Sequence, residues 1–558
     1  MTSRTRTGAQ ILVDQLIVHG ATVGFGVPGE SYLAVLDAMY GVGDRFRFIV
    51  CRHEANAANM AEAAGKLTGA PGLCFVTRGP GATHASSGMH NGRQDSTPMI
   101  LFIGQVATDF IGREAFQEVD YGKMFSELSK LVVVLDNPHR IPELISRAFH
   151  AAVNGRPGPV VVVLPEDVLT QISDVVDARP YKRAEAAPTP AAMQELAEHI
   201  AKAQRPLMMV GGQGWTPQAK ADIVRFAEAW NLPVAANFRR QDIVDNRHAL
   251  YIGEVGLGVN PALAQAIKDT DLLIAVGPRM SEATTSGYEL IDIPTPRQAL
   301  VHVHLDPNEL GRVYHSVLPI VAGPGPFSAA AAALQPSGPP QYAAWTEKLR
   351  HNYVAYNTPE PQGEETDLGQ IVSGLSKRLP DNAIICNGAG NYTTWVHRYF
   401  QYRPTGAQLA PTSGAMAYGF PAGIAAKVIR PDAPVVVFAG DGCFLMSAQD
   451  LATAVRYNLA MVIIVINNGS YGTIRMHQER HFPGRVFGTD LNNPDFVAMA
   501  QSFGAYGELV EDGDDFWAAY ERAAAFGGPA LLEVRTGLEK LTPRIRLSAL
   551  RAPLKAGT

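Results

Sequence analysis

The chain has 558 residues, of which 46% are hydrophobic and 18% are charged, a composition that is ordinary for a protein with a large buried core and that excludes intrinsic disorder and a fibrous architecture. Lysine and arginine total 47 while aspartate and glutamate total 53, a formal charge of −6, so charge gives no case for nucleic acid or a membrane surface as partner. At roughly 100–200 residues per domain, the length predicts about three or four domains.

The four cysteines stand far apart, with no pair in a CxxC arrangement: Cys51, Cys74, Cys386 and Cys443. This spacing excludes a disulfide framework and a structural zinc site of thiolates, and we expect reduced thiols in a cytoplasmic protein. The apolar stretch near the amino terminus is broken by Asp14 and Gln15, which indicates an amphipathic helix and not a signal peptide. No run of about eighteen apolar residues is present, so no segment is expected to span a bilayer.

The first block of the chain, from about residue 8 to residue 170, alternates strand-like apolar runs with alanine-rich helical runs. Strands are expected at 72–77, 99–103 and 160–164, and helices at 55–66 and 141–153. That alternation predicts an α/β layer structure around a parallel sheet. The charged, proline-rich stretch 177–190 has no apolar period and indicates a linker.

Two further α/β blocks follow the linker. In the second block, strands are expected at 206–210, 232–235, 271–276 and 299–305, before a stretch rich in proline, glycine and alanine at 323–340. In the third block, strands are expected at 383–386, 434–439, 461–466 and 529–534. No repeat of about 20–50 residues is evident, so a solenoid is not expected. We predict three domains, at residues 1–175, 190–335 and 366–558.

The most informative segment of the third block runs from residue 434 to residue 471. A buried strand is expected to end in Gly440-Asp441-Gly442, helical spacing follows over 445–457, and a second buried strand ends in Asn467-Asn468. Twenty-four residues lie between Gly442 and Asn467, enough for one helix and one strand. In such sheets ligands bind beyond the carboxyl ends of the strands, so Asp441 and Asn468 should face one crevice.

The chemistry of these two side chains points to a metal. A carboxylate and an amide oxygen are hard ligands, which suit Mg²⁺ or Ca²⁺, and Mg²⁺ commonly completes its shell with phosphate oxygens. The helix expected after Gly442 adds unpaired N–H groups that face the same position. The residues alone therefore predict a metal-bridged diphosphate site, and a plain strand-to-helix turn capped by Asp441 is the alternative.

A GDG triplet that is followed, one helix and one strand later, by NN resembles the diphosphate–Mg²⁺ motif of thiamine diphosphate-dependent enzymes. The resemblance implies that Asp441 and Asn468 are side-chain ligands of Mg²⁺ and that Ser470 contributes its backbone carbonyl. The other cofactor contacts that it implies around these segments are Pro28, Gly79, Gly440, Gly442, Tyr471 and Gly472.

Two other segments match the same family. Arg52-His53-Glu54 precedes an alanine-rich helix and a glycine-proline turn, and the resemblance implies that Glu54 contacts the aminopyrimidine ring of the cofactor. Met416 stands where a bulky apolar residue holds the cofactor bent, and the carbonyl of Gly414 would face the amino group of the ring. Taken alone, Glu54 could be a helix-initiating carboxylate, and Met416 could be ordinary core filler.

Within this superfamily, the chain looks most similar to the large subunit of acetolactate synthase, through the segments 104–106, 115–118 and 156–168. The resemblance implies an α/β fold of three doubly wound parallel-sheet domains: pyrimidine-binding, middle and diphosphate-binding. It implies a decarboxylating carboligase that joins a 2-oxo acid to a carbonyl acceptor through an enamine and releases a 2-hydroxy ketone. The catalytic residues that we expect are Glu54, Phe116, Gln117 and His477.

In this family, Glu54 and Asp441 would come from different subunits, so the resemblance implies a homodimer or homotetramer. His477 stands where the biosynthetic enzymes carry a tryptophan, and Ala283 stands where they carry an arginine. Both departures concern recognition of the second substrate. FAD is a further cofactor that the glycine turns at 210–214 and 276–279 could hold, although these turns could also be empty remnants.

Other interpretations are open at the level of sequence. Residues 24–29 fit GxGxxG, which would indicate a nicotinamide or flavin oxidoreductase, but Pro28 removes an N–H that a phosphate would need, so we expect a loop facing the cofactor cleft. Within the superfamily, a 2-oxo acid decarboxylase, a benzaldehyde-lyase-like enzyme and a 2-hydroxyacyl-coenzyme A lyase are alternatives. The last would need basic residues such as Arg239 and Arg240, which we expect to be a solvated pair.

A non-enzymatic regulator is opposed by the intact set of Glu54, Asp441 and Asn468. His84 and His90 are expected in the loop after the glycine-proline turn, as structural histidines more than as proton relays. Lys130 could meet an anionic intermediate or be solvated.

Overall fold

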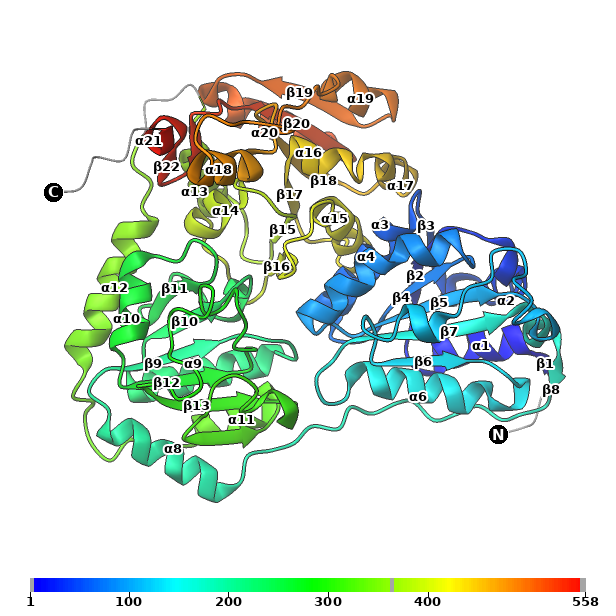
Figure 1. The fold of residues 1–558 in the computed structure, drawn as a ribbon, viewed down its shortest axis with the longest axis horizontal. Helices are drawn as coiled ribbons and strands as arrows, with labels where there is room; N and C mark the ends of the chain where they lie inside the picture. The colour runs from blue at the N-terminus through cyan, green and yellow to red at the C-terminus, as the bar shows by residue number, and fades with distance from the viewer. Residues whose placement is uncertain (1–4, 362–365, 552–558) are drawn as a thin grey trace. The chain divides into compact units, whose positions relative to one another are not determined.

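The computed structural model describes residues 5–361 and 366–551. Three six-stranded sheets, one in each predicted block, contain parallel strand pairs throughout and are flanked by helices (Figure 1). The predicted fold class is therefore confirmed. By its internal contacts the chain divides into two compact units: residues up to 184 with 424–431 and 447–459, and the remaining residues. The domain boundaries at 1–175, 190–335 and 366–558 stay a prediction.

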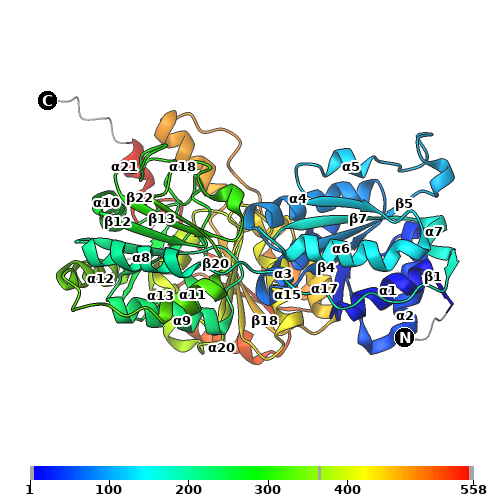
Figure 2. The ribbon, with the colours of Figure 1, turned by 90° about the horizontal axis from the view of Figure 1, so that it is seen from below.

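The N-terminal sheet has the strand order β3–β2–β4–β5–β7–β6. Its strands are β2 (Val23–Gly26), β3 (Arg47–Val50), β4 (Gly72–Val76), β5 (Met99–Gln105), β6 (Leu131–Val134) and β7 (Pro159–Pro165). Helices α1 (Gly8–Val18), α2 (Leu33–Val42) and α6 (Ile141–Val153) share one hydrophobic core with the sheet, and α1 lies beside α6 (Figure 2). Short elements of this unit are β1 (Arg6–Thr7), α5 (Tyr121–Met124), α7 (Glu166–Thr170) and β8 (Ile172–Ser173).

Helices α3 (Glu54–Thr68) and α4 (Pro80–Asp95) pack directly on each other. A Cβ added at Gly88 would lie only 2.4 Å from the Cβ of Ala58, so the small residues of this pair allow close approach of the two helices. His84 and His90 lie on α4 and not in a loop, which corrects the expectation. The close packing brings the N-terminal ends of the two helices together.

The segment 447–459 of the third block belongs to this same compact unit. The single helix expected over 445–457 is wrong, because α16 (Asp441–Leu445) ends early and α17 (Leu451–Arg456) begins after a 3₁₀ turn. That turn places Asp450 so that its carboxylate accepts hydrogen bonds from Arg52 N at 2.9 Å and Asn56 Nδ2 at 2.5 Å. The entry into α3 is therefore anchored by a residue far along the chain.

The central sheet has the strand order β11–β10–β9–β12–β13–β14. Its strands are β9 (Pro206–Val210), β10 (Val234–Asn237), β11 (Tyr251–Val255), β12 (Leu272–Val276), β13 (Ala299–His304) and β14 (Leu318–Val321). Its helices are α8 (Pro190–Lys202), α9 (Pro217–Trp230), α10 (Pro261–Asp269), α11 (Pro324–Ala332) and α12 (Ala343–Asn357). Four of them begin with proline, which is preorganised for the first helical position. Helix α11 occupies a stretch for which no element was expected.

The C-terminal sheet has the strand order β16–β15–β17–β18–β20–β19. Its strands are β15 (Ile384–Asn387), β16 (Ala407–Leu409), β17 (Val435–Gly440), β18 (Met461–Asn467), β19 (Tyr506–Val510) and β20 (Pro529–Arg535). Its further helices are α13 (Leu368–Arg378), α14 (Thr393–Tyr399), α15 (Gly419–Ile429), α18 (Gly472–His481), α19 (Phe496–Ser502) and α20 (Phe516–Ala525). A small hairpin of β21 (Lys540–Thr542) and β22 (Ile545–Arg546) precedes α21 (Leu547–Arg551).

The expected strands of all three blocks are present, with ends that differ by a few residues. Among residues 5–361 and 366–551, no helix combines the length and the apolar character needed to cross a membrane. The glycines of residues 24–29 do not form a phosphate loop, because Gly24 and Gly26 lie inside β2. A Cβ at Gly26 would stand 2.4 Å from the carbonyl oxygen of Phe75, so this glycine serves contact with the neighbouring strand.

Candidate active site

A cavity of about 230 Å³ opens at the carboxyl end of the C-terminal sheet, between β15 and β17. From β15 the chain continues to β16 on one side of the sheet, and from β17 it continues to β18 on the other side. The strand order therefore reverses between β15 and β17. Ligands usually bind at such a reversal point in parallel sheets. The predicted residues that line the cavity are Gly414, Met416, Gly440, Asp441, Gly442, Asn468, Ser470, Tyr471 and Gly472. One cavity therefore collects every residue that was expected around the metal loop.

Asp441 is the charged group of this cavity and is almost fully buried. Its Oδ1 accepts a hydrogen bond from Gly442 N at 2.9 Å, and its Oδ2 accepts from Gly469 N and from Asn493 Nδ2, both at 2.8 Å. Burial raises the pKa of the Asp441 carboxyl, while these hydrogen bonds act in the opposite direction. The carboxylate is thus held in place by neutral donors and has no cationic side chain among these contacts.

The loop after β18 faces Asp441. Asn468 Oδ1 accepts from Ser470 N at 3.1 Å, and the Ser470 carbonyl accepts from Gly472 N at 2.8 Å. Each of these oxygens has a second lone pair, which leaves a site for a further ligand. Gly469 has a φ of +65°, so the loop folds back in a conformation that glycine adopts without strain.

Glycine is required at one position of the cavity wall in particular. A Cβ at Gly442 would lie 2.5 Å from the ring of Tyr471. Gly414 lies in a turn with a φ of +69°, followed shortly by the half-buried Met416, which packs against the C-terminal core. Five of the residues that line the cavity are glycines, and at these positions a ligand can approach main-chain N–H and C=O groups closely.

Two parts of this site were not predicted from the sequence. The loop of residues 389–392 also lines the cavity, and the hydroxyl of Tyr392 accepts a hydrogen bond from Gly388 N at 3.1 Å. The run of glycines directly after an apolar strand was the signal that could have found it. Asn493, which joins Asp441 to Asn467 Oδ1 at 2.9 Å, carries no local signal.

The predicted residues of the N-terminal block meet at the carboxyl ends of neighbouring strands, β3, β2, β4 and β5. Glu54 is the first residue of α3, and its Oε2 lies 2.9 Å from His84 Nδ1. Gly79 has a φ of +61°, and a Cβ there would lie 2.9 Å from the Cβ of Gln117. Gly79 N donates to the hydroxyl of Tyr121 at 2.8 Å, a further residue that the sequence analysis did not single out.

Phe116 and Pro28 complete this second group. The carbonyl of Phe116 accepts from Arg78 Nε at 3.2 Å, while its ring is 74% exposed and therefore free to contact a ligand or another chain. Pro28 precedes Gly29, where a Cβ would lie 2.4 Å from Thr77. The five expected residues Pro28, Glu54, Gly79, Phe116 and Gln117 thus lie along one edge of the N-terminal sheet.

His477 lies on α18, whose first turn lines the cavity up to Ile474, and is exposed beyond that lining. Its ring stacks on that of His481 with centroids 6.3 Å apart. Partial burial, followed by the nearby Arg480 and His481, lowers the pKa of His477. The helix therefore carries two imidazoles beyond the turn that lines the cavity, and His477 is not part of the cavity wall.

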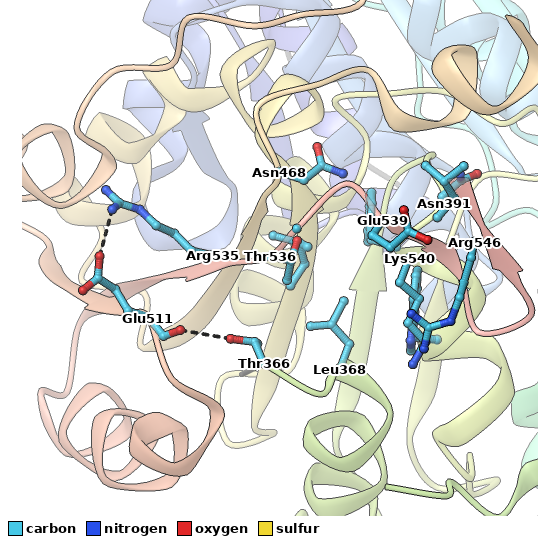
Figure 3. Close-up of a pocket in the computed structure, with 15 residues that line it drawn as sticks. Thr366, Leu368, Asn391, Asn468, Glu511, Arg535, Thr536, Glu539, Lys540 and Arg546 are labelled. Carbon is cyan, nitrogen blue, oxygen red and sulfur yellow. Dashed lines mark hydrogen bonds and ion pairs between the residues drawn. The ribbon is translucent and has the colours of Figure 1, made fainter. Parts of the chain in front are cut away.

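A larger cavity of about 570 Å³ adjoins the first and shares Asn391, Tyr392, Ile466 and Asn468 with it. Figure 3 shows charged residues of both signs around it, including Arg535, which pairs with Glu511 at 2.9 Å. The smaller cavity has the stronger claim to the chemistry, because it contains the buried carboxylate and the glycine-rich backbone wall.

The expectation that Arg239 and Arg240 form a solvated pair is wrong. Arg239 and Arg240 are buried and not solvated: Arg239 donates to the carbonyl of Pro411, and Arg240 donates to Gln213 Oε1 at 2.9 Å and pairs with Asp242. Lys130 directly precedes β6, at the edge of the sheet opposite the expected site, and donates to the carbonyl of Asn154 at 2.7 Å. A role of Lys130 with an intermediate is therefore not supported.

Comparisons with known proteins agree with this arrangement. Three domains of the thiamine pyrophosphate enzymes match in order: the N-terminal TPP binding domain at residues 6–124, the central domain at 193–332, and the C-terminal TPP binding domain at 388–534. The acetolactate synthase isozyme 2 large subunit of Escherichia coli is 31% identical over 543 residues, covering 96% of this chain and 97% of its own. The acetolactate synthase large subunit of Parasynechococcus marenigrum is 32% identical over 522 residues, covering 91% of this chain and 84% of its own.

The probable acetolactate synthase large subunit of Methanocaldococcus jannaschii is 30% identical over 572 residues, covering 98% of this chain and 95% of its own. The three matched domains follow the order of the three sheets, and the relatives match nearly the full length of the chain. The chain is a thiamine diphosphate-dependent enzyme and belongs to the family of the acetolactate synthase large subunits.

Proposed function

We propose that this protein is an acetolactate synthase-like carboligase that removes carbon dioxide from a 2-oxo acid and joins the remaining acyl unit to a carbonyl acceptor, giving a 2-hydroxy ketone. The observation that carries the proposal is the cavity at the reversal point of the C-terminal sheet, which gathers the buried Asp441, Asn468 and the glycine turns in one place. When bound there, thiamine diphosphate would stabilise the negative charge that decarboxylation leaves on the acyl carbon.

The residues of the cavity fit the diphosphate and its metal. Asp441, Asn468 and the Ser470 carbonyl form a donor set of oxygens only, which suits Mg²⁺. The side chain of Asp441 is buried without a cation among its hydrogen-bond donors, and a divalent ion would supply the missing positive charge. We infer that these three residues hold Mg²⁺, that Gly440, Gly442, Tyr471 and Gly472 surround the diphosphate, and that Gly414 and Met416 support the rings.

On the N-terminal sheet, we assign Glu54 the role of holding and exchanging a proton at the pyrimidine ring, with Pro28 and Gly79 lining the approach. Phe116 and Gln117 would contact the substrate, and His477 would contact the acceptor from α18. A water-poor setting would strengthen these polar contacts and favour loss of a carboxylate. Because Glu54 and Asp441 belong to different sheets and would act together across subunits, we infer a homodimer or homotetramer.

Two finer points are part of the proposal. The turns after β9 and β12 face each other so closely that a Cβ at Gly212 would lie 2.1 Å from the Gly277 carbonyl oxygen, which leaves bare backbone at the reversal point of the central sheet. Such a turn pair supports FAD as a further cofactor. The four cysteines are buried and none of them forms a disulfide, which supports a reducing compartment, the cytoplasm.

The alternative chemistries within the superfamily differ in their products. A coenzyme A lyase is disfavoured, because Arg239 and Arg240 are buried and form hydrogen bonds within the protein.

The deciding experiment is product analysis by NMR. Holoenzyme would be supplied with pyruvate alone, and then with pyruvate and a panel of aldehydes and 2-oxo acids. A 2-hydroxy ketone or 2-hydroxy-2-alkyl-3-oxo acid supports the carboligase, whereas free aldehyde as the sole product would establish a simple decarboxylase.

A further inference from the structure

His84 is in direct contact with Glu54, although the proposed chemistry gives His84 no role. The distance between His84 Nδ1 and Glu54 Oε2 is 2.9 Å, and the residues are 30 positions apart. They meet because α3 and α4 pack side by side, with Glu54 at the start of one helix and His84 in the N-terminal part of the other. The His84 side chain is about half exposed, whereas that of Glu54 is mostly covered.

His53 holds the imidazole of His84 from another side. The two rings stack with their centroids 4.7 Å apart and their planes at 27°. His53 is itself fixed, because its Nδ1 accepts a hydrogen bond from Ala55 N at 3.1 Å as the cap of α3. His84 is therefore confined between a stacked ring and a carboxylate, despite its exposure.

The same three side chains could be taken for a metal site, since a donor atom from each of His53, Glu54 and His84 lies within 4.8 Å of the others. The cap hydrogen bond argues against this. The lone pair of His53 Nδ1 is used by Ala55 N, and a neutral imidazole with an accepting Nδ1 carries its proton on Nε2. In that tautomer neither nitrogen of His53 has a lone pair left for a metal ion.

We propose that His84 is a positioning residue for Glu54, whose carboxylate it orients by donating a hydrogen bond from Nδ1 to Oε2. The inference rests on the proposed function, in which Glu54 meets the pyrimidine ring. An ionised carboxylate only accepts hydrogen bonds, so the proton lies on Nδ1 when Glu54 is ionised. The other oxygen, Oε1, lies beside Gly81, where an added Cβ would stand at 3.5 Å, and is thereby turned towards a residue without a side chain.

The two oxygens of Glu54 would therefore have different roles. Oε2 accepts the hydrogen bond from His84, and Oε1 is left to interact with the ring nitrogen of the cofactor. Hydrogen bonds to charged groups are strong and directional, so this one would restrict the carboxylate to the orientation in which Oε1 can exchange a proton. Loss of such a bond should slow proton exchange more than it weakens cofactor binding, because the diphosphate and its metal are held elsewhere.

The test compares three substitutions at His84. His84→Leu removes the donor, His84→Asn keeps an N–H close to the position of Nδ1, and His84→Gln places its N–H one bond further out. His90→Leu, on the same helix and also exposed, is the matched control. Two quantities are measured on the Mg²⁺-loaded protein: the rate at which solvent deuterium replaces the C2 hydrogen of bound thiamine diphosphate, by quenched NMR, and the Kd of thiamine diphosphate, by calorimetry.

We expect His84→Leu and His84→Gln to slow the exchange about ten- to a hundredfold, with Kd unchanged. His84→Asn should restore most of the rate, and His90→Leu should match the wild type. Wild-type exchange in both His84→Leu and His84→Gln would overturn the inference. Equal slowing in His84→Asn and His84→Leu would also overturn it, because a proton relay through the imidazole would then be the role of His84. If His84→Leu does not fold, the comparison of His84→Asn with His84→Gln decides the question.

Two further measurements separate this inference from its premises. Glu54→Gln is expected to abolish exchange. If Glu54→Gln exchanges normally, the role of Glu54 in the proposed function fails and His84 loses its role with it. If Glu54→Gln is inactive and His84→Leu is normal, only the inference about His84 fails. One equivalent of zinc in the purified protein, absent from His84→Leu, would establish the metal site in place of the hydrogen bond.

Discussion

The carboxylate of Asp450 accepts a hydrogen bond from Asn56 Nδ2 at 2.5 Å, across 394 positions of sequence. The same carboxylate accepts from Arg52 N at 2.9 Å and from Thr453 Oγ1 at 2.7 Å. Its partners Arg52 and Asn56 stand on either side of Glu54, so Asp450 fixes the chain at the point where the expected catalytic carboxylate enters its helix. A residue without a catalytic role thereby determines where Glu54 can lie.

Asp450→Ala should destabilise the protein strongly. Three donors would lose their acceptor in a buried setting, for which we expect a loss of about 2–4 kcal/mol in the free energy of unfolding. Denaturant titration followed by circular dichroism measures the loss. Asp432→Ala removes an exposed aspartate and serves as control. Equal stability of the two variants would show that the Asp450 contacts contribute nothing net.

Glu254 should make stability depend on pH. Burial raises its pKa to about 7 from 4.5, while the Arg239 N–H, 2.6 Å from Oε1, and the Arg239 charge act to lower it. The folded state therefore retains a proton that the unfolded chain loses above pH 4.5. The contribution of Glu254 to the free energy of unfolding is therefore fully present below pH 4.5. It is lost as the pH rises towards 7, and the loss is at most about 3 kcal/mol.

Glu254→Gln should flatten this part of the stability profile, which is measured by denaturant titration between pH 4.5 and 8. Buried His397 lies 3.6 Å from Glu254, so the difference between the two profiles reports the titration of Glu254 together with its coupling to His397. Glu347→Gln, an exposed glutamate on α12, controls for the change of net charge. Parallel profiles for wild type and Glu254→Gln would contradict the expectation.

Asn493→Ala should weaken cofactor binding, because Asn493 Nδ2 ties Asp441 Oδ2 to Asn467 Oδ1 and so orients the expected metal ligand. Residues that orient a ligand from behind typically change metal affinity about 10–100-fold. Calorimetry with Mg²⁺ and thiamine diphosphate measures the effect, with Asp441→Ala as the variant expected to abolish binding. Asn492→Ala, an exposed neighbour, should bind normally; binding by Asn493→Ala that matches it would remove the positioning role.

His477→Trp should shift acceptor preference. His477 is exposed on α18, just beyond the turn that lines the cavity, where a larger apolar ring would narrow and dry the approach. We expect a larger share of products from 2-oxo acid acceptors relative to aldehydes in competition experiments analysed by NMR. His481→Trp, one turn further along the same helix, is the control. An unchanged product ratio in His477→Trp would exclude His477 from acceptor selection.

Much of the metal loop could be predicted from sequence because its information is local. Continuous apolar runs identify buried parallel strands, and the residues that follow them must lie at the carboxyl edge of the sheet. Asp441 and Asn468 accordingly line one cavity, together with Gly414 and Met416, which the family resemblance implied. Glu54 was placed by the family resemblance, and no local pattern indicated its contact with His84, which was expected in a loop and lies on α4 against Glu54.

The sequence by itself determined the fold class, the order of the three sheets, and the strand ends at which the polar residues stand, because hydrophobic period and turn residues act over short stretches of chain. Only the tertiary structure decided which polar groups meet: Asp450 with Asn56, Asn493 with Asp441, and His84 with Glu54. These pairs join segments whose proximity depends on helix packing and on sheet topology. A buried donor can be satisfied by any acceptor that the fold brings within reach, and no periodicity in the sequence specifies which one that is.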